Sequence, residues 1–455
     1  MHGPGKLTKK WRHIEQLGLV LLALVLLPTA ARATDLLDVY KLALSNDPTY
    51  LAAKANYNAE REKLGVASSV LWPHVYASAN VGWNDINSGL IPVMNPSASA
   101  QQTYSNSGYA ITLSEPLFDW EAFAAVSQAH AGVRQATAVF EAQREGLFLR
   151  VAGAYFHLLL ANDNLGLAKS QEAAISQQRE VAQGRLKVGL GTITEVDDAN
   201  ARYQMAAAQE LQAQNNLADA QQAMREIAGN IPPKLLKLRD DIPLQQPTPA
   251  DINQWVTKAL SQNYQVVAAK EGTVIAKREI SRQHAGAYPK LNVVGRYFSS
   301  NNIGAEFGIS GANETGTSVG LQLTVPIFQG GLVHKLSKSA GYTYEAAQQN
   351  LEATRRHVER EVRDAYLGIS SGASRVSALK QAVVASKSAL EAKKTGYEAG
   401  INTNLQVLDA QRDLYQAQRD YAAARYDYVF SELRLKQAAG TLSETDLAQI
   451  NSWLQ

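Results

Sequence analysis

The chain has 455 residues, of which 45% are hydrophobic, and a formal net charge of +2, so it is long enough to bury a substantial core. The near-zero net charge argues against a nucleic-acid-binding protein. The absence of cysteine excludes disulfides, thiolate metal sites and a lipid-bearing cysteine from this sequence.

The first 33 residues predict a secretory signal peptide. A basic stretch (6–13) precedes an apolar run (17–27), and the small-residue pattern Ala31-Arg32-Ala33 predicts cleavage before Thr34. A membrane anchor is the alternative, but a helix that spans a bilayer needs roughly 20 apolar residues and this run is shorter. We therefore expect an exported mature chain that begins at Thr34.

The remainder of the chain contains an internal duplication. The stretch VGLGTITEVDDA (188–199) is similar to AGINTNLQVLDA (399–410), with Gly189 equivalent to Gly400. Three more pairs of segments are similar and keep the same order: 36–69 and 252–284, 71–83 and 287–298, and 111–120 and 321–330. The expected organisation is a first repeat, a proline-rich irregular connector, a second repeat and a tail, at 34–230, 231–250, 251–440 and 441–455. Copies of this length exclude a short-period solenoid.

The second part of each repeat predicts two long helices. No proline occurs between Pro116 and Pro232 or after Pro326, and good helix formers dominate these stretches. Only the turns near 188–194 and 399–404 interrupt them, so each repeat should hold a helix of roughly 65 residues and one of roughly 35–40. Apolar residues follow coiled-coil spacing in the last helix: Leu405, Leu408, Tyr415, Ala422, Val429 and Leu433. Taken alone, these helices also fit a plain antiparallel coiled coil.

Alternation of apolar with small polar residues ahead of the long helices predicts β-strands. The expected strands are 74–83, 109–114, 290–298 and 318–325. Aromatic residues stand near the strand ends, as is typical of a membrane interface, and the loops 84–107 and 300–316 are rich in Asn, Ser and Gly. The alternative is a small soluble sheet whose apolar face is buried.

The number of strands bears on how such a sheet could sit in a membrane. Only a closed barrel satisfies every backbone group of a sheet in lipid. The smallest single-chain barrels have about eight strands, and this chain offers half that number. We therefore expect several chains to contribute strands to one barrel.

The duplicated order of helix, strand, strand, long helix, turn and helix resembles the outer-membrane efflux channel family typified by TolC. The motifs that carry the resemblance are VGL (188–190), LSEPLFDW (113–120), VPIFQGG (325–331) and the C-terminal stretch 409–442. The resemblance covers nearly the whole mature chain. It implies a mainly α protein with a membrane β-barrel: a homotrimer whose twelve strands close in the outer membrane of a Gram-negative bacterium. It also implies a helical coiled-coil tunnel across the periplasm, with an equatorial belt formed by the connector and the tail.

The resemblance further implies that the two helical turns dock on a periplasmic adaptor protein. Val188, Gly189 and Leu190 match the docking motif of the family. The second turn matches that motif less closely, with Ala399, Gly400 and Ile401. The alternative for both glycines is that they only end a helix.

A gate near the turns is also implied by the resemblance. The acid, tyrosine and arginine that tie the family's helices together correspond to Glu195, Tyr397 and Asn402. We expect Glu195 to accept a hydrogen bond from Tyr397, and Asn402 to replace an ion pair with a weaker neutral bond. The alternative is that Glu195 and Tyr397 are solvated and do not meet.

An acidic ring at the tunnel entrance is implied less completely. The family's paired aspartates correspond to Gln406 and Asp409, so only one acid is retained. Asp198 of the first repeat is a further candidate for the ring. Its neighbour Asp197 is expected to face solvent.

These features predict an outer-membrane export channel that works with an adaptor and an inner-membrane ABC or proton-driven transporter. The cargo is not evident, because the pump that selects it is a separate chain. We expect the channel to lie in outer-membrane lipid. We expect no nucleic acid, cofactor, metal or catalysis, because the sequence contains no phosphate-binding loop and no histidine pair with metal-ligand spacing. The alternative is a soluble periplasmic coiled-coil scaffold or adaptor with a small β domain.

Overall fold

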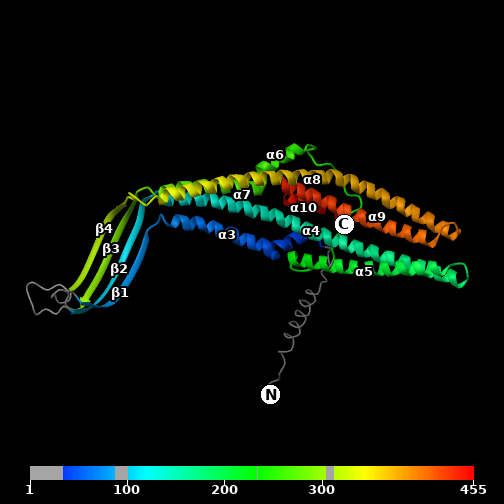
Figure 1. The fold of residues 1–455 in the computed structure, drawn as a ribbon, viewed down its shortest axis with the longest axis horizontal. Coiled ribbons are helices and arrows are strands. Elements are labelled where there is room, and N and C mark those ends of the chain that lie inside the picture. Colours follow the sequence, from blue (N-terminus) through cyan, green and yellow to red (C-terminus); the bar gives the residue numbers. More distant parts are fainter. Residues whose placement is uncertain (1–33, 88–100, 233, 304–311) are drawn as a thin grey trace, which may run out of the picture. The chain divides into compact units, whose positions relative to one another are not determined.

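The computed structural model describes residues 34–87, 101–232, 234–303 and 312–455. The chain divides into two compact units. One unit comprises the described residues up to Leu51 together with Arg144–Ile252 and Val362–Gln455, and the other comprises Ala52–Gln143 and Asn253–Glu361. The two longest helices are α4 (Trp120–Lys187) and α8 (Leu332–Glu398) (Figure 1). Each contributes residues to both units.

The same order of elements occurs in both halves of the chain. The first half contains α2 (Leu36–Asn46), α3 (Pro48–Ser69), β1 (His74–Asn87), β2 (Gln101–Asp119), α4 and α5 (Ile193–Ala228). The second half contains α6 (Ile252–Gln262), α7 (Tyr264–Ala285), β3 (Lys290–Ile303), β4 (Ala312–Thr324), α8 and α9 (Asn404–Ala438), and α10 (Glu444–Asn451) follows. The long helices have 68, 36, 67 and 35 residues, which confirms the predicted lengths. The mainly α fold with four strands is confirmed as well.

The four strands form one antiparallel sheet in the order β1-β2-β3-β4 (Figure 1). The strands are longer than the sequence predicted, because pairing continues to Asn87 opposite Gln101 and to Asn302 opposite Ala312. The predicted loops 84–107 and 300–316 are therefore wrong at both of their ends, while their middles (88–100 and 304–311) lie outside the described residues. Backbone hydrogen bonds hold a ladder together whatever the side chains are, so polar Asn, Ser and Thr residues extend these strands.

Strand β2 also continues through a proline that was expected to end it. The predicted strand stopped at Ser114, but the pairing of β2 with β3 runs on to Asp119 opposite Lys290. The register shifts between Pro116 and Phe118. A proline has no backbone N–H to give to the ladder, and a bulge of this kind absorbs the missing bond.

One set of apolar side chains on the sheet has no cover within the described chain. Val81, Val319 and Leu321 are 88%, 78% and 69% exposed. The soluble alternative required an apolar sheet face that is buried, so these exposures contradict it. Among the described residues, no helix has the length and apolar character that crossing a membrane requires.

The connector and the tail meet in the first unit. Leu238 and Leu454 form an antiparallel bridge, and Thr34 and Leu235 form a parallel one. Trp453 and Leu454 are buried. The tail contains the helix α10, which the sequence did not predict.

Candidate functional site: the two helical tips

The first tip connects α4 to α5. Gly189 adopts a left-handed conformation with φ of 74°. Its N–H donates to the carbonyl of Leu186 at 3.0 Å, and the N–H of Leu190 donates to the carbonyl of Arg185 at 2.9 Å. This pattern satisfies the last carbonyls of the helix and favours glycine, so the helix-ending role holds here. Val188 and Leu190 on either side are 69% and 70% exposed.

The second tip connects α8 to α9 with the same geometry. Gly400 has a φ of 78°, and the N–H of Ile401 donates to the carbonyl of Gly396 at 2.8 Å. Ala399 is exposed and Ile401 is 81% exposed. Open space surrounds the position of a Cβ at both tip glycines, so each tip presents bare backbone beside an exposed aliphatic side chain.

A capping box begins the helix after each tip. At α5 the N–H of Glu195 donates to Thr192 Oγ1 at 3.2 Å, and the N–H of Thr192 donates to Glu195 Oε2 at 3.4 Å. Thr403 and Gln406 form the equivalent pair at α9. The carboxylate of Glu195 is therefore engaged by its own helix, as expected of an acid in this position.

The predicted tie between Glu195 and Tyr397 is not formed in this chain. Tyr397 is 6% exposed, and its hydroxyl has no hydrogen-bond partner among the described residues. Asn402 does not join the two hairpins either, because its Nδ2 donates at 3.3 Å to the carbonyl of Lys393 on the preceding helix. The carboxylate of Glu195 caps its own helix, and the amide of Asn402 bonds to the helix before it. Neither side chain therefore joins the two hairpins.

Arg185 occupies the place where that tie was expected. Its guanidinium carbon lies 4.9 Å from the ring centroid of Tyr397. Burial raises the pKa of the Tyr397 hydroxyl, while the charge of Arg185 opposes this rise and that of Glu195 adds to it. The three side chains therefore lie close enough to interact electrostatically, and the direct contact is a cation–π contact.

Asn404, which was not identified from the sequence, makes a short hydrogen bond between the two hairpins. We call the part of α4 from Arg144 with α5 the first hairpin, and the part of α8 from Val362 with α9 the second hairpin. Gln178 Nε2 donates to Asn404 Oδ1 at 2.6 Å, and Asn404 Nδ2 donates to the carbonyl of Glu195 at 3.3 Å. Asn404 is fully buried.

The candidate acids of the entrance have different surroundings. Asp409 pairs with Arg202 at 2.8 Å and with Arg412 at 3.4 Å, so its charge is compensated within the chain. Asp198 is half-buried, and Asp197 is exposed, as predicted. The arginine partners of Asp409 were not identified from the sequence.

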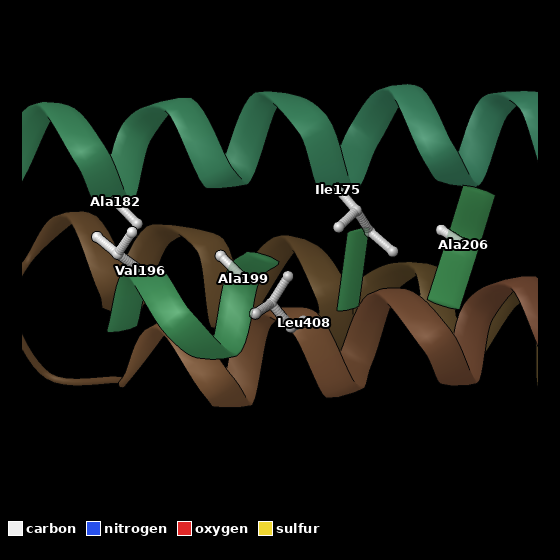
Figure 2. Close-up of a cluster of buried hydrophobic side chains, with 6 residues drawn as sticks. All are labelled: Ile175, Ala182, Val196, Ala199, Ala206 and Leu408. Atoms are coloured by element: carbon white, nitrogen blue, oxygen red, sulfur yellow. The ribbon is translucent and has the colours of Figure 1, made fainter. Parts of the chain in front are cut away.

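Apolar clusters support the tips from within. The first cluster consists of Ile175, Ala182, Val196, Ala199 and Ala206 of the first hairpin with Leu408 of the second. Figure 2 shows Leu408 directed from α9 toward this cluster. The second cluster contains Leu390, Tyr397, Val407 and Leu414. Over the described ranges, no group of His, Cys, Asp and Glu is arranged to hold a metal ion.

Comparison with known proteins identifies the family. The model of the outer membrane efflux protein family matches residues 39–230 and 255–441. Outer membrane protein TolC of Vibrio cholerae serotype O1 is 35% identical over 434 residues, which cover 95% of this chain and 97% of the relative. The alkaline protease secretion protein AprF of Pseudomonas aeruginosa is 30% identical over 366 residues, which cover 78% of this chain and 74% of the relative.

A solved structure agrees with this fold. The CmeC outer membrane channel of Campylobacter jejuni superimposes with a TM-score of 0.76 at 18% identity, over 92% of this chain and 90% of that one. The chain belongs to the outer membrane efflux protein family. These comparisons confirm the resemblance described above. They also confirm that the chain is an outer-membrane channel for efflux or secretion.

Proposed function

We propose that three copies of the chain assemble into a continuous export duct, with a twelve-stranded barrel in the outer membrane. The observation that carries this proposal is the open sheet with its uncovered apolar face. β1 and β4 each have one edge that no strand of the described chain pairs. Open edges in lipid leave backbone groups unsatisfied, and pairing β4 of one copy with β1 of the next removes both kinds of edge.

The tips are the proposed docking site for a periplasmic adaptor. Val188 and Leu190 flank Gly189 on the first tip, and Ile401 follows Gly400 on the second. Exposed aliphatic side chains beside unobstructed backbone support a close contact with an apolar partner segment. The second tip offers less apolar surface, since Ala399 stands where the first tip has Val188.

The closed state of the duct is held at the tips in this proposal. Contacts between the hairpins that support it are Gln178 with Asn404, Arg185 with Tyr397, and Arg202 with Asp409. Asp409 and Asp198 remain the proposed acids of the entrance. Because Arg202 pairs with Asp409, the proposed ring has less negative charge than it would have with Asp409 unpaired.

The partner in the inner membrane is proposed to be an ABC transporter or a proton-driven pump. The likeness to a protein named for alkaline protease secretion supports protein export, and the family description supports efflux. One duct can serve both routes when the pump selects the cargo. The proposal includes no catalytic step, and the family's members are channels.

Export in cells tests the proposal. Cells that lack the chain should accumulate a fluorescent pump substrate or retain a secreted protein, and the wild-type chain should restore export. Fractionation should place the chain in the outer membrane, and detergent should be needed to extract it. A fully soluble product, or deletion without any export defect, would contradict the proposed function.

Gly189→Asp tests docking at the first tip. A charge and a side chain enter the proposed apolar contact, so we expect adaptor binding to weaken by about tenfold or more. The positive φ adds a local strain of about 1 kcal/mol without disturbing packed neighbours. A pull-down with the cognate adaptor measures recovery, and Gly184→Asp is the control because Gly184 lies within α4 in open space. Equal recovery of both variants leaves Gly189 only its role in ending the helix.

A further inference from the structure

Carboxamide side chains recur every seven residues on two facing helices. They are Asn164, Gln171 and Gln178 on α4 and Asn404, Gln411 and Gln418 on α9. We call these six residues the carboxamide seam. Gln171, Asn404 and Gln411 are 7%, 0% and 2% exposed. A seven-residue repeat keeps side chains on one stripe of a helix, where apolar residues are usual in a coiled coil.

Contacts along the two helices set the register of the seam. Gln178 bonds Asn404 near the tip, and farther away the rings of Phe156 and Tyr426 lie 5.9 Å apart. Tyr415 Oη also donates to the carbonyl of Ser170 at 2.9 Å. Because the helices are antiparallel, each step of seven residues down α4 meets a step of seven up α9. Gln171 is therefore level with Gln411, and Asn164 with Gln418.

Apolar layers alternate with these carboxamide layers. Ile175 and Ala168 lie between the carboxamides of α4, and Leu408 lies between those of α9. All three are buried, and Leu408 reaches the apolar cluster of the first hairpin (Figure 2). Every second layer of this contact between the hairpins is thus polar.

The carboxamides are incompletely bonded within the chain. Asn164 Oδ1, Gln411 Oε1 and Gln418 Oε1 are buried and have no hydrogen-bond partner among the described residues. Asn164 and Gln171 of the seam line a cavity of about 150 Å³ together with Tyr415, Arg419 and side chains of α5. Buried polar atoms without protein partners are commonly satisfied by water, and a cavity of this size has room for several water molecules.

We propose that the carboxamide seam is a hydrated and reversible contact, along which the second hairpin detaches from the first when the duct opens. This inference rests on the proposed export function. Exchanging an amide–amide bond for amide–water bonds changes the free energy little, whereas separating an apolar layer exposes surface that water disfavours. Polar layers at fixed spacing also define one register to which the hairpin returns.

A reversible crosslink tests the seam directly. The natural chain has no cysteine, so Gln171→Cys with Gln411→Cys introduces a single pair across the seam. We expect oxidation to reduce export by about tenfold or more, within the range of measured coupling between sites, and a reductant to restore it. The control is Ala182→Cys with Val196→Cys, which joins α4 to α5 inside the first hairpin and should leave export unchanged when oxidised.

Leucine substitution tests the same inference without a crosslink. Gln171→Leu with Gln411→Leu replaces both partners of a polar layer by apolar ones, which should raise the unfolding midpoint and lower export. Gln214→Leu on the exposed side of α5 is the control, with neither effect expected. Unchanged export in the oxidised seam pair or in the leucine pair overturns the inference. The wild-type chain in the same assay reports on the proposed function separately, since that function fails only if wild type does not export.

Discussion

Two buried stripes near the tips have the same spacing and opposite chemistry. On α5 the stripe is Ala199, Ala206, Ala213 and Ala220, which are 0%, 2%, 8% and 1% exposed. On α9 it is Asn404, Gln411 and Gln418, of the carboxamide seam. Ala199 and Ala206 pack with α4 in a cluster that also takes in Leu408 of α9, whereas the carboxamide stripe contacts α4 across the two hairpins.

We infer that the alanine stripe is a firm contact and the carboxamide stripe an exchangeable one. Small apolar residues let two helices approach closely, and any larger side chain there must force them apart. Carboxamides can exchange one another for water at little net cost in free energy. A heptad pattern therefore fixes where two helices touch, and the residue type at the repeat decides how firmly they are held.

The largest effect is expected from moving an amide into the alanine stripe. Ala206→Gln puts a bulky polar group into a buried apolar cluster, and we expect it to lower the free energy of unfolding by about 2–4 kcal/mol. Thermal unfolding in detergent measures this change. Ala208→Gln on the exposed side of the same helix is the control, with a change of about 0.5 kcal/mol or less. Equal effects of the two substitutions would mean that the alanine stripe is not a tight contact.

The second largest effect is expected from removing one partner of the Gln178–Asn404 bond, as compared with removing both. Asn404→Leu leaves Gln178 without its partner, so we expect the contact between the hairpins to weaken by about 1–3 kcal/mol. Conductance in a planar bilayer without adaptor should rise. Gln178→Leu with Asn404→Leu removes both partners and should return conductance to the wild-type level or below. A double variant that conducts more than the single one would contradict this account of the layer.

A smaller effect is expected at the tip itself. Arg185→Met removes the charge above the ring of Tyr397 and should weaken the closed state by about 0.5–1 kcal/mol, the usual size of a half-exposed cation–π contact. Single-channel recordings should show more frequent opening. Arg185→Lys keeps the charge and should have a weaker effect. If Lys and Met behave alike, the charge plays no part in the contact.

The smallest effect concerns the hydroxyl of Tyr397. It is buried without a partner in the described chain, so Tyr397→Phe should leave stability unchanged or raise it by about 1 kcal/mol. Chemical denaturation of the purified protein measures this. Phe also keeps the ring that Arg185 contacts, so opening should be unaffected. A loss of stability would show that the hydroxyl gains an acceptor from another chain.

Much of the helical architecture could be predicted from the sequence, because it follows from local composition. Long proline-free stretches of good helix formers gave helix lengths close to those observed, and the glycines marked both tips. Strand positions were predicted from alternation, but their ends were not. The Asn- and Ser-rich extensions, such as Asn84–Asn87, pair through their backbone, which leaves no apolar pattern to detect.

The contacts between the hairpins were only partly predictable. Tyr397 was correctly placed near the first hairpin, but its neighbour proved to be Arg185 and not an acceptor on Glu195. The choice of partner depends on the register of two helices far apart in sequence, which no local pattern records. The seven-residue spacing of Asn404 and Gln411, and of Gln171 and Gln178, was the available signal.

The number of chains in the assembly tests the central claim most directly. Light scattering of protein extracted from outer membranes, corrected for bound detergent, gives this number. We expect three chains, because three copies of a four-stranded sheet close a barrel of twelve strands and leave no edge unpaired. A single chain that keeps its sheet and remains stable in detergent would contradict it.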